Sequence, residues 1–188
     1  KYNVQYMQTT QLNITTPYVN NGWYILTEKN GYSSLSYIRE IQDDETNKYN
    51  NRIYENLYKT VNKEEMGSSP LKLHEHFGRR TTPPAQLLVL QSGGQGDIDV
   101  NSTTFEKDIN LKQAFIGGNY PVDFRPVNAM FMQWVDLLQN HDGKIYSRVK
   151  QTNELIHSGF FIQTPMKIEE HEIYGQLIHS RIGDTQYC

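Results

Sequence analysis

The sequence has very little of several features that define common protein classes. Its single cysteine is the last residue, Cys188, so no internal disulfide can form, which excludes a small disulfide-stapled module. The formal net charge is −3, whereas wrapping nucleic acid requires concentrated lysine and arginine. No apolar run approaches the roughly 20 residues that cross a bilayer as a helix, so no membrane span is expected.

Alanine is scarce as well. It occurs three times and only 37% of residues are hydrophobic, whereas asparagine, threonine and tyrosine are plentiful. Asparagine and threonine are poor helix formers, while tyrosine and threonine suit the pleated surface of a sheet, so the composition predicts an all-β protein with long loops. The mean hydropathy is −0.69, but disordered chains are usually poor in aromatic residues, and 12% here are aromatic. Segments that become ordered by packing on a partner are therefore expected.

The run of residues 87–90, Leu-Leu-Val-Leu, is the clearest structural signal. It follows Pro83-Pro84, which cannot donate backbone hydrogen bonds, and precedes the turn-forming Ser92-Gly93-Gly94. A short apolar run with such flanks predicts a strand covered on both faces, although periodicity alone also permits a short buried helix.

Turn signals divide the first part of the chain into short strands. Apolar and polar residues alternate in 2–6 and 12–15, which predicts two half-buried strands. Asn20-Asn21-Gly22 and Asn30-Gly31 predict hairpin turns, because asparagine and glycine tolerate positive φ. The acidic block 42–47 is interpreted as a solvated loop tip rather than a binding site, since charge runs usually face water.

Residues 127–139 carry two conflicting patterns. Their apolar side chains fall at helical spacing and would form one stripe on a helix. The segment nevertheless ends at 140–143, Asn-His-Asp-Gly, which is a hairpin-type turn, and 144–149 then alternates like a strand. On the residues alone, helix and strand both stay open.

Oxygen donors recur at alternate positions after a glycine-rich connector. They are Asp97, Asp99 and Asn101, and Asp108 stands twelfth counted from Asp97. A calcium loop needs several carboxylate or carbonyl oxygens on one concave side, so a structural calcium ion is one interpretation, with no other cofactor expected. The helix-loop-helix calcium motif demands glycine where this chain has Ser102 and a bidentate glutamate where it has Asp108. A surface strand with outward carboxylates is therefore the simpler prediction.

Other patterns for chemistry are few. If the chain is extended, His74 and His76 lie on one face and could hold a transition metal together with Asp97 or Asp99, as in a metal-dependent hydrolase. A polar loop cluster is the simpler interpretation, because zinc sites usually show four ligands at recognisable spacing. No nucleophile elbow, phosphate-binding loop or dinucleotide fingerprint occurs, so no catalytic residue is predicted and an enzyme is not expected.

Four segments, taken in order, resemble one known family. They are 52–56 (Arg-Ile-Tyr-Glu-Asn), 70–77 (Pro-Leu-Lys-Leu-His, then Phe77), 83–89 (Pro-Pro-Ala-Gln-Leu-Leu-Val) and 128–139 (Asn-Ala-Met-Phe-Met-Gln-Trp-Val-Asp-Leu-Leu-Gln). Their order and pattern are similar to the late part of parvovirus capsid proteins, and within that family to densoviruses. The likeness favours a strand at 128–139. The residues that it places in core strands are Leu87, Val89, Met130, Met132 and Trp134.

The resemblance implies an antiparallel jelly-roll β-sandwich of which this chain holds only the later strands. Residues 1–80 are then mainly a large inter-strand surface loop region, 81–150 hold the last core strands, and 151–188 form a C-terminal surface tail. Because two strands alone cannot close a sandwich, a second capsid polypeptide or an N-terminal segment is expected to complete it.

The function so implied is that of a structural coat protein. Copies would assemble in the host nucleus into a small icosahedral shell, the virion, which packages single-stranded DNA through weak contacts and attaches to a host receptor through surface loops. Aromatic residues contribute strongly to interfaces but also to protein cores, so each residue predicted as an interface anchor could instead be an internal core residue. The anchors are Tyr18, Trp23, Tyr24, Phe160 and Phe161. The rival function is a β-sandwich module of a toxin or fibre that binds carbohydrate or a receptor through exposed tyrosine and tryptophan.

Overall fold

The computed structural model describes Tyr18, Leu177 and the ranges 22–43, 48–77, 85–151, 159–166, 180–182 and 185–187. These residues form mostly antiparallel β-sheets, which confirms the all-β prediction. The strands expected at 2–6 and 12–15, the first two residues of the turn at 20–22, and residues 44–47 of the acidic block lie outside the described residues.

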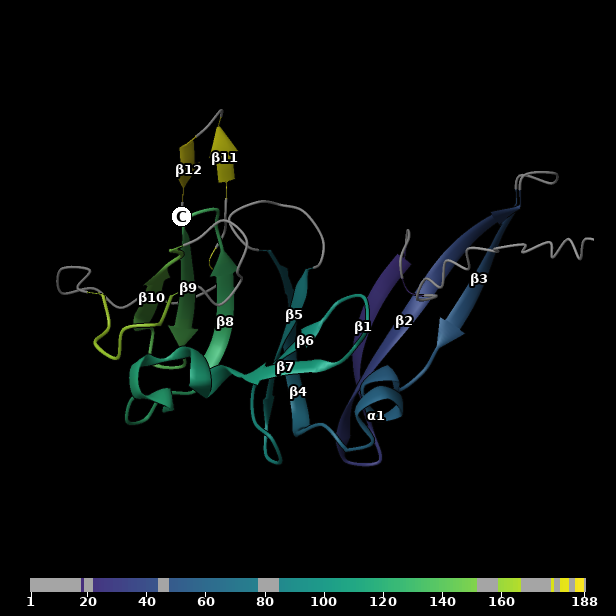
Figure 1. Ribbon diagram of the computed structural model, residues 1–188, viewed down its shortest axis with the longest axis horizontal. Helices are drawn as coiled ribbons and strands as arrows, with labels where there is room; N and C mark the ends of the chain where they lie inside the picture. The colour runs from purple at the N-terminus through teal and green to yellow at the C-terminus, as the bar shows by residue number, and fades with distance from the viewer. Residues whose placement is uncertain are drawn as a thin grey trace, which may run out of the picture.

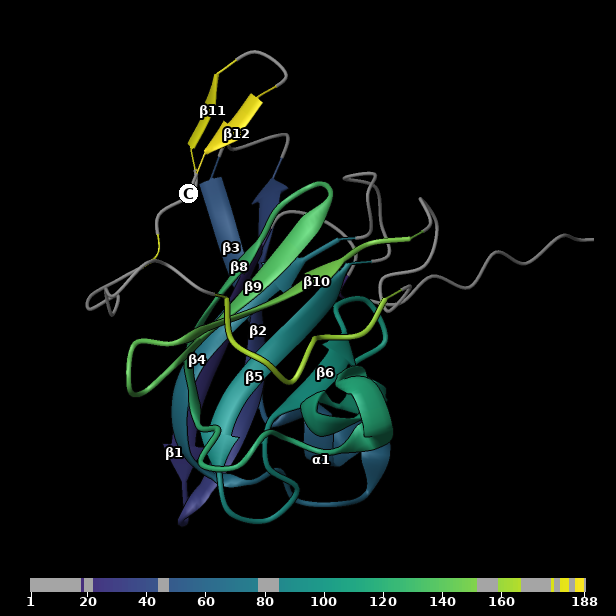
Figure 2. The ribbon, with the colours of Figure 1, turned by 90° about the vertical axis from the view of Figure 1, so that its left-hand side faces the viewer.

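Three sheets are stacked as layers, with the largest in the middle (Figures 1 and 2). The first outer sheet has the order β1-β2-β3, from β1 (Gly22–Lys29), β2 (Tyr32–Asp43) and β3 (Lys48–Tyr54). The middle sheet has the order β4-β5-β6-β7, from β4 (Ser68–His76), β5 (Gln86–Ser92), β6 (Ile98–Asn101) and β7 (Lys107–Asn110). The second outer sheet has the order β10-β9-β8, from β8 (Pro126–Phe131), β9 (Val135–Asn140) and β10 (Ile145–Val149).

Short elements connect these sheets. The helix α1 (Leu57–Asn62) joins the first outer sheet to the middle one. Two short 3-10 helices, η1 (Leu111–Ala114) and η2 (Ile116–Gly118), lie between β7 and β8. A separate hairpin of β11 (Ser180–Ile182) and β12 (Thr185–Tyr187) lies near the C-terminus. Among the described helices, none combines the length and the apolar character needed to cross a membrane.

Strand β5 explains why the chain is layered. Side chains alternate across a strand, so Leu87 and Val89 face one neighbouring sheet while Leu88 and Leu90 face the other. The first pair belongs to a core shared with the first outer sheet, and the second pair to a core shared with the second outer sheet. All four side chains are inaccessible to solvent, which confirms the predicted strand covered on both faces. Each such burial contributes about 1.5–3 kcal/mol.

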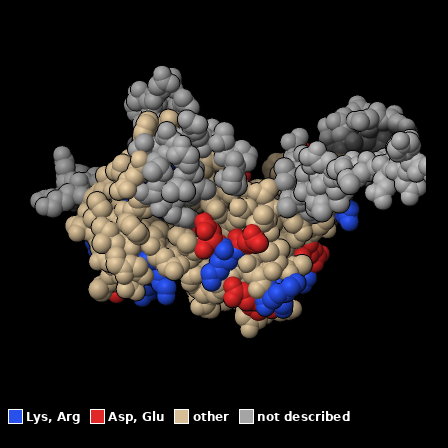
Figure 3. Space-filling view, in the orientation of Figure 1, with Lys and Arg blue, Asp and Glu red and all other residues tan. Residues whose placement is uncertain are grey.

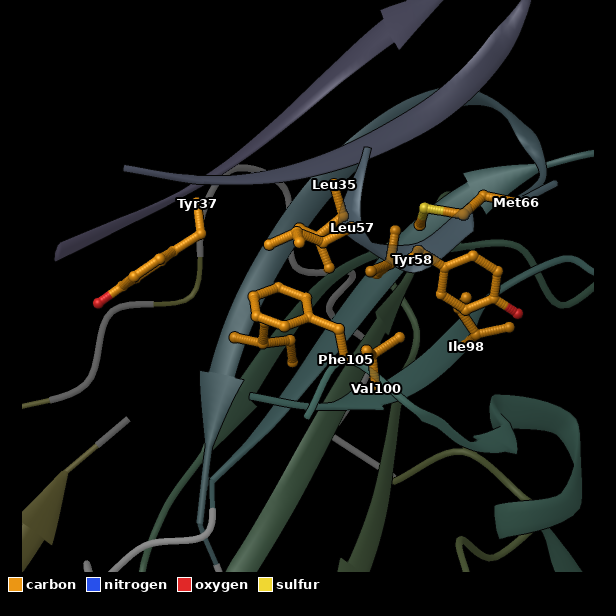
Figure 4. Packing of buried hydrophobic residues seen from close by; sticks show 10 residues of the cluster. Leu35, Tyr37, Leu57, Tyr58, Met66, Ile98, Val100 and Phe105 are labelled. Atoms are coloured by element: carbon orange, nitrogen blue, oxygen red, sulfur yellow. The ribbon is translucent and has the colours of Figure 1, made fainter. Parts of the chain in front are cut away.

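The first core lies between the first outer sheet, α1 and the middle sheet. Leu35 of β2, Leu57 of α1 and Phe105 point toward one another from different elements (Figure 4). The turn that precedes β2 is the predicted two-residue hairpin, with φ of 55° at Asn30 and 80° at Gly31. Positive φ at both positions is the geometry whose twist matches two paired strands.

The second core lies between the middle sheet and the second outer sheet. The segment 159–166 runs beside β10, where the Ile162 N–H donates to the Ser147 carbonyl at 3.1 Å and the Met166 N–H to the Ile145 carbonyl at 2.7 Å. This segment therefore covers the edge of β10, which would otherwise present unpaired backbone groups. Leu177 packs on a third, smaller cluster, in line with a tail that lies along a surface.

Residues 126–149 correct the prediction of one core strand at 128–139. The segment holds two strands, β8 and β9, which reverse direction at Met132, Gln133 and Trp134. Trp134 is half-exposed rather than in the core. Both strands carry apolar residues on both faces. Because the chain reverses between them, the alternation of β9 is out of step with that of β8, and the apolar residues of the whole segment coincide with helical spacing. The predicted turn after them is present, with the Gly143 N–H donating to the Asn140 carbonyl at 3.1 Å.

The fold bears on three further expectations. Residues 1–80, expected to be mainly surface loop, contribute β1 to β4 and α1 and much of the first core in their described part. Within the described residues the core side chains are buried by the chain itself, so none of them depends on the expected second polypeptide for its burial. Among the described strands every pairing joins neighbours in sequence; the Greek-key crossovers of a jelly roll are not among them, and the jelly roll stays a prediction.

Candidate functional site

The outer face of sheet β1-β2-β3 carries a row of large apolar side chains. Trp23 pairs with Ile38, and Ile38 pairs with Ile53, in the register of the three strands, so all three project from the same face. Their neighbours Tyr24 and Tyr37 project from the other face, into the first core. Trp23 is 64% exposed and Ile53 is 61% exposed. We call Trp23, Ile38 and Ile53 the outer apolar row.

The five aromatic residues predicted as interface anchors are divided between surface and core. Tyr18 and Tyr24 are partly buried against the first core, and Phe161 is completely buried in the second. These three residues therefore lie in or against a core, as the alternative to an interface role expects. Trp23 and Phe160 are exposed, so only these two are available to a partner.

Two histidines lie on the same face of β4, as extended backbone requires. His76 is buried, its Nε2 lies 2.8 Å from Asp99 Oδ1, and its ring stacks on Phe131 with centroids 4.0 Å apart. Burial, reinforced by the positive charge of Lys72, lowers the pKa of His74 to about 4. The polar cluster therefore lies in a strand and not in the loop that was expected.

The predicted calcium ligands have separate protein partners. Asp97 accepts a hydrogen bond from the backbone of β5, Asp99 pairs with a histidine of β4, and Asn101 caps the turn that follows β6. Asp108 is exposed on β7. In the part of the chain that the structure describes, no three His, Cys, Asp or Glu side chains gather in a group that could hold a metal ion. Neither the calcium site nor the metal-dependent hydrolase gains support there.

A buried ionic cluster lies between the middle and second outer sheets. Arg148 Nε donates to Asp136 Oδ2 at 2.7 Å, and Lys150 Nζ lies 3.0 Å from Asp136 Oδ1. The second contact is an ion pair without hydrogen-bond alignment. Lys150 Nζ also donates to the carbonyls of Phe77 and Met132, at 2.9 and 2.7 Å. All three charged side chains are at most 1% exposed. Burial lowers the pKa of Lys150, and Asp136 partly restores it.

A cleft of about 510 Å³ opens at the opposite end of the same two sheets. On its wall, Asp97 Oδ1 accepts from the Gln91 backbone N–H at 2.9 Å, and Asp97 Oδ2 accepts from the Tyr120 hydroxyl at 2.7 Å. Burial raises the pKa of Asp97 to about 6, and burial together with the nearby carboxylate raises the pKa of Tyr120. The remaining wall is largely apolar, formed in part by Leu71 and Phe124. A concave, mainly apolar space with a few polar groups is typical of small-molecule sites.

Sequence reasoning missed the ionic cluster and the partner of Asp97. Arg148 and Lys150 alternate with the buried Tyr146 along one face of the chain, and that alternation was the signal that marked them as inward-facing. Tyr120 lies 23 residues from Asp97 in a loop, and no local pattern joins the two.

The surface in view carries acidic and basic side chains interspersed, without a field of one sign (Figure 3). Comparison with protein-family models, curated proteins and solved structures yields no match for this chain.

Proposed function

We infer that the protein is a non-catalytic structural protein that assembles with copies of itself through the outer apolar row. The observation that carries this inference is the exposure of Trp23 and Ile53 on one face of an ordered sheet, on either side of Ile38. Single exposed apolar residues are common and need no explanation, but a cross-strand row of large apolar side chains that includes a tryptophan is the kind of patch that marks an interface.

The row is suited to carry binding energy. Tryptophan is among the residues most enriched at binding hot spots, and such residues usually sit in the centre of a patch that excludes water. The three strands hold the side chains in a fixed register, so little additional ordering is needed when a partner docks. The indole N–H of Trp23 donates to Glu40 Oε1 at 3.2 Å, which leaves the ring face available.

The specific role that we assign is a viral coat protein of the densovirus type. Its support is the ordered resemblance of four segments to late capsid sequence and the β-rich fold. In this role the copies form a small icosahedral virion around single-stranded DNA, assembled in the host nucleus, and surface loops contact a host receptor. The jelly roll of that family remains part of the proposal. The partner at the outer apolar row is another copy of the chain, and the second capsid polypeptide that the resemblance implies stays a prediction.

Sedimentation equilibrium of the wild type and of Trp23→Ser tests the interface. The substitution removes a side chain that is 64% exposed, so it should leave the fold intact and weaken self-association at least about 30-fold, the equivalent of about 2 kcal/mol. The control is Val122→Ser, which also removes an exposed apolar side chain, 90% exposed, but lies outside the row. Equal weakening by both variants, or no weakening by either, would refute the proposed interface.

A second candidate function is the carbohydrate- or receptor-binding module of a toxin or fibre. The exposed ring of Trp23 favours it, because an exposed indole can stack on a sugar ring. This candidate predicts a monomer or trimer at all concentrations and quenching of tryptophan fluorescence by sugars. The coat protein predicts higher assemblies and no such quenching.

A further inference from the structure

The rim of the cleft holds two nitrogen-bearing side chains that have no polar partner among the described residues. Arg125 is exposed, and within the described residues its guanidinium makes no hydrogen bond or ion pair. The ring of His141 likewise contacts no described polar group. The His141 N–H donates to the Arg125 carbonyl at 3.1 Å, so the two residues are held side by side. An unpaired guanidinium at a concave surface is a ready partner for a carboxylate, which it can bind through two parallel hydrogen bonds.

The wall of the cleft holds oxygen atoms that can accept further hydrogen bonds. Gln91 is 7% exposed, its Nε2 donates to the Gly96 carbonyl at 2.7 Å, and its buried Oε1 accepts no hydrogen bond. An unsatisfied buried acceptor costs about 1–3 kcal/mol, so a donor from a ligand would be favourable there. The carboxylate of Asp97, next to Gln91, also has oxygen lone pairs for a ligand hydroxyl beyond those used by Tyr120 and the β5 backbone.

We propose that this cleft binds a hydroxylated ring that carries a carboxylate, which is the chemistry of a uronic acid. The carboxylate would pair with Arg125 and His141 at the rim, ring hydroxyls would donate to Gln91 and Asp97, and the apolar ring face would lie against the wall near Leu71. The volume of about 510 Å³ falls within the range of small-ligand sites, about 300–1,000 Å³.

Two simpler ligands fit the same groups less well. A neutral sugar would supply hydroxyls but leave the guanidinium of Arg125 uncompensated. A plain ring carboxylate would pair with Arg125 but leave the Gln91 oxygen without a donor. The site lies on the second outer and middle sheets, away from the outer apolar row, so it does not depend on assembly.

Calorimetric titration of the full chain with three probes tests the ligand class. D-glucuronate carries both the hydroxyls and the carboxylate, D-glucose carries the hydroxyls alone, and cyclohexanecarboxylate carries the ring and carboxylate alone. Saturable binding of glucuronate, at least 10-fold tighter than either other probe, supports the proposal. Absence of saturable glucuronate binding, or binding of either simpler probe with equal affinity, overturns it.

Matched variants locate the site. Arg125→Gln should weaken glucuronate binding at least 10-fold and leave glucose binding unchanged. Arg52→Gln makes the same chemical change at an arginine that lies over the Tyr54 ring, outside the cleft, and should bind glucuronate like the wild type. Because Arg125 is exposed, a thermal melt should show both variants folded. Unchanged glucuronate affinity in folded Arg125→Gln would overturn the assignment.

Discussion

Asp136→Asn should be among the most destabilising single-atom changes that this chain can receive. The wild-type carboxylate is completely buried and compensates Arg148 at 2.7 Å and Lys150 at 3.0 Å, both of which are also buried. The amide keeps the shape but loses the charge, which removes the carboxylate that both buried cations face. Breaking a buried ion pair from one side costs about 3–5 kcal/mol, which is a large part of the about 5–15 kcal/mol that stabilises a typical domain.

Urea unfolding followed by tryptophan fluorescence measures this cost. The control is Asp142→Asn in the β9–β10 turn, the same chemical change at a carboxylate that lies 2.6 Å from Lys144 but is 31% exposed, as is 51% of the lysine side chain. Exposed pairs contribute only about 0–1 kcal/mol. If Asp136→Asn lost no more stability than Asp142→Asn, the cluster would not be the buried, mutually compensating group that the distances indicate.

Two further predictions concern the core and the pH dependence. Leu88→Ala should lower the free energy of unfolding by about 2–5 kcal/mol. The control Leu71→Ala, at a half-exposed position, should lower it by less than about 1 kcal/mol. Equal losses in the two variants would contradict the two-sided burial of β5. Burial raises the pKa of Asp97 to about 6, so the contribution of Asp97 to stability is present at low pH and is lost as pH rises through 6. Burial lowers the pKa of His74 to about 4, so the contribution of His74 is present above about pH 6.5 and is lost as pH falls toward 4. Between pH 6.5 and 4, acidification should therefore destabilise Asp97→Asn more, and His74→Gln less, than the wild type in urea unfolding; parallel curves for the three proteins would contradict these environments.

The sequence was sufficient for those parts of the fold that local patterns encode. The apolar run 87–90 with its proline and glycine flanks predicted β5 and its two-sided burial. Asn30-Gly31 predicted its hairpin, because only residues that accept positive φ fit that turn. These features depend on neighbours in the chain and on a single strand's alternation, so they can be derived without knowledge of the remaining structure.

The sequence was insufficient where the outcome depends on which distant segments meet. Trp134 was expected in a core strand, but a three-residue reversal places it at the surface. His76 was expected in a polar loop, but β6 brings Asp99 to it across the middle sheet. The cleft combines β4, β5, β8, two loops and the turn after β9, so Arg125 and Gln91 carry no local sign that they share a site.

Electron microscopy of the purified chain is the most direct test of assembly through the first outer sheet. We predict closed particles of uniform size, in which a reconstruction places Trp23 and Ile53 at the contact between neighbouring copies, and loss of these particles in Trp23→Ser. Isolated single molecules at every protein concentration, or particles in which the outer face of β1-β2-β3 remains open to solvent, would contradict it.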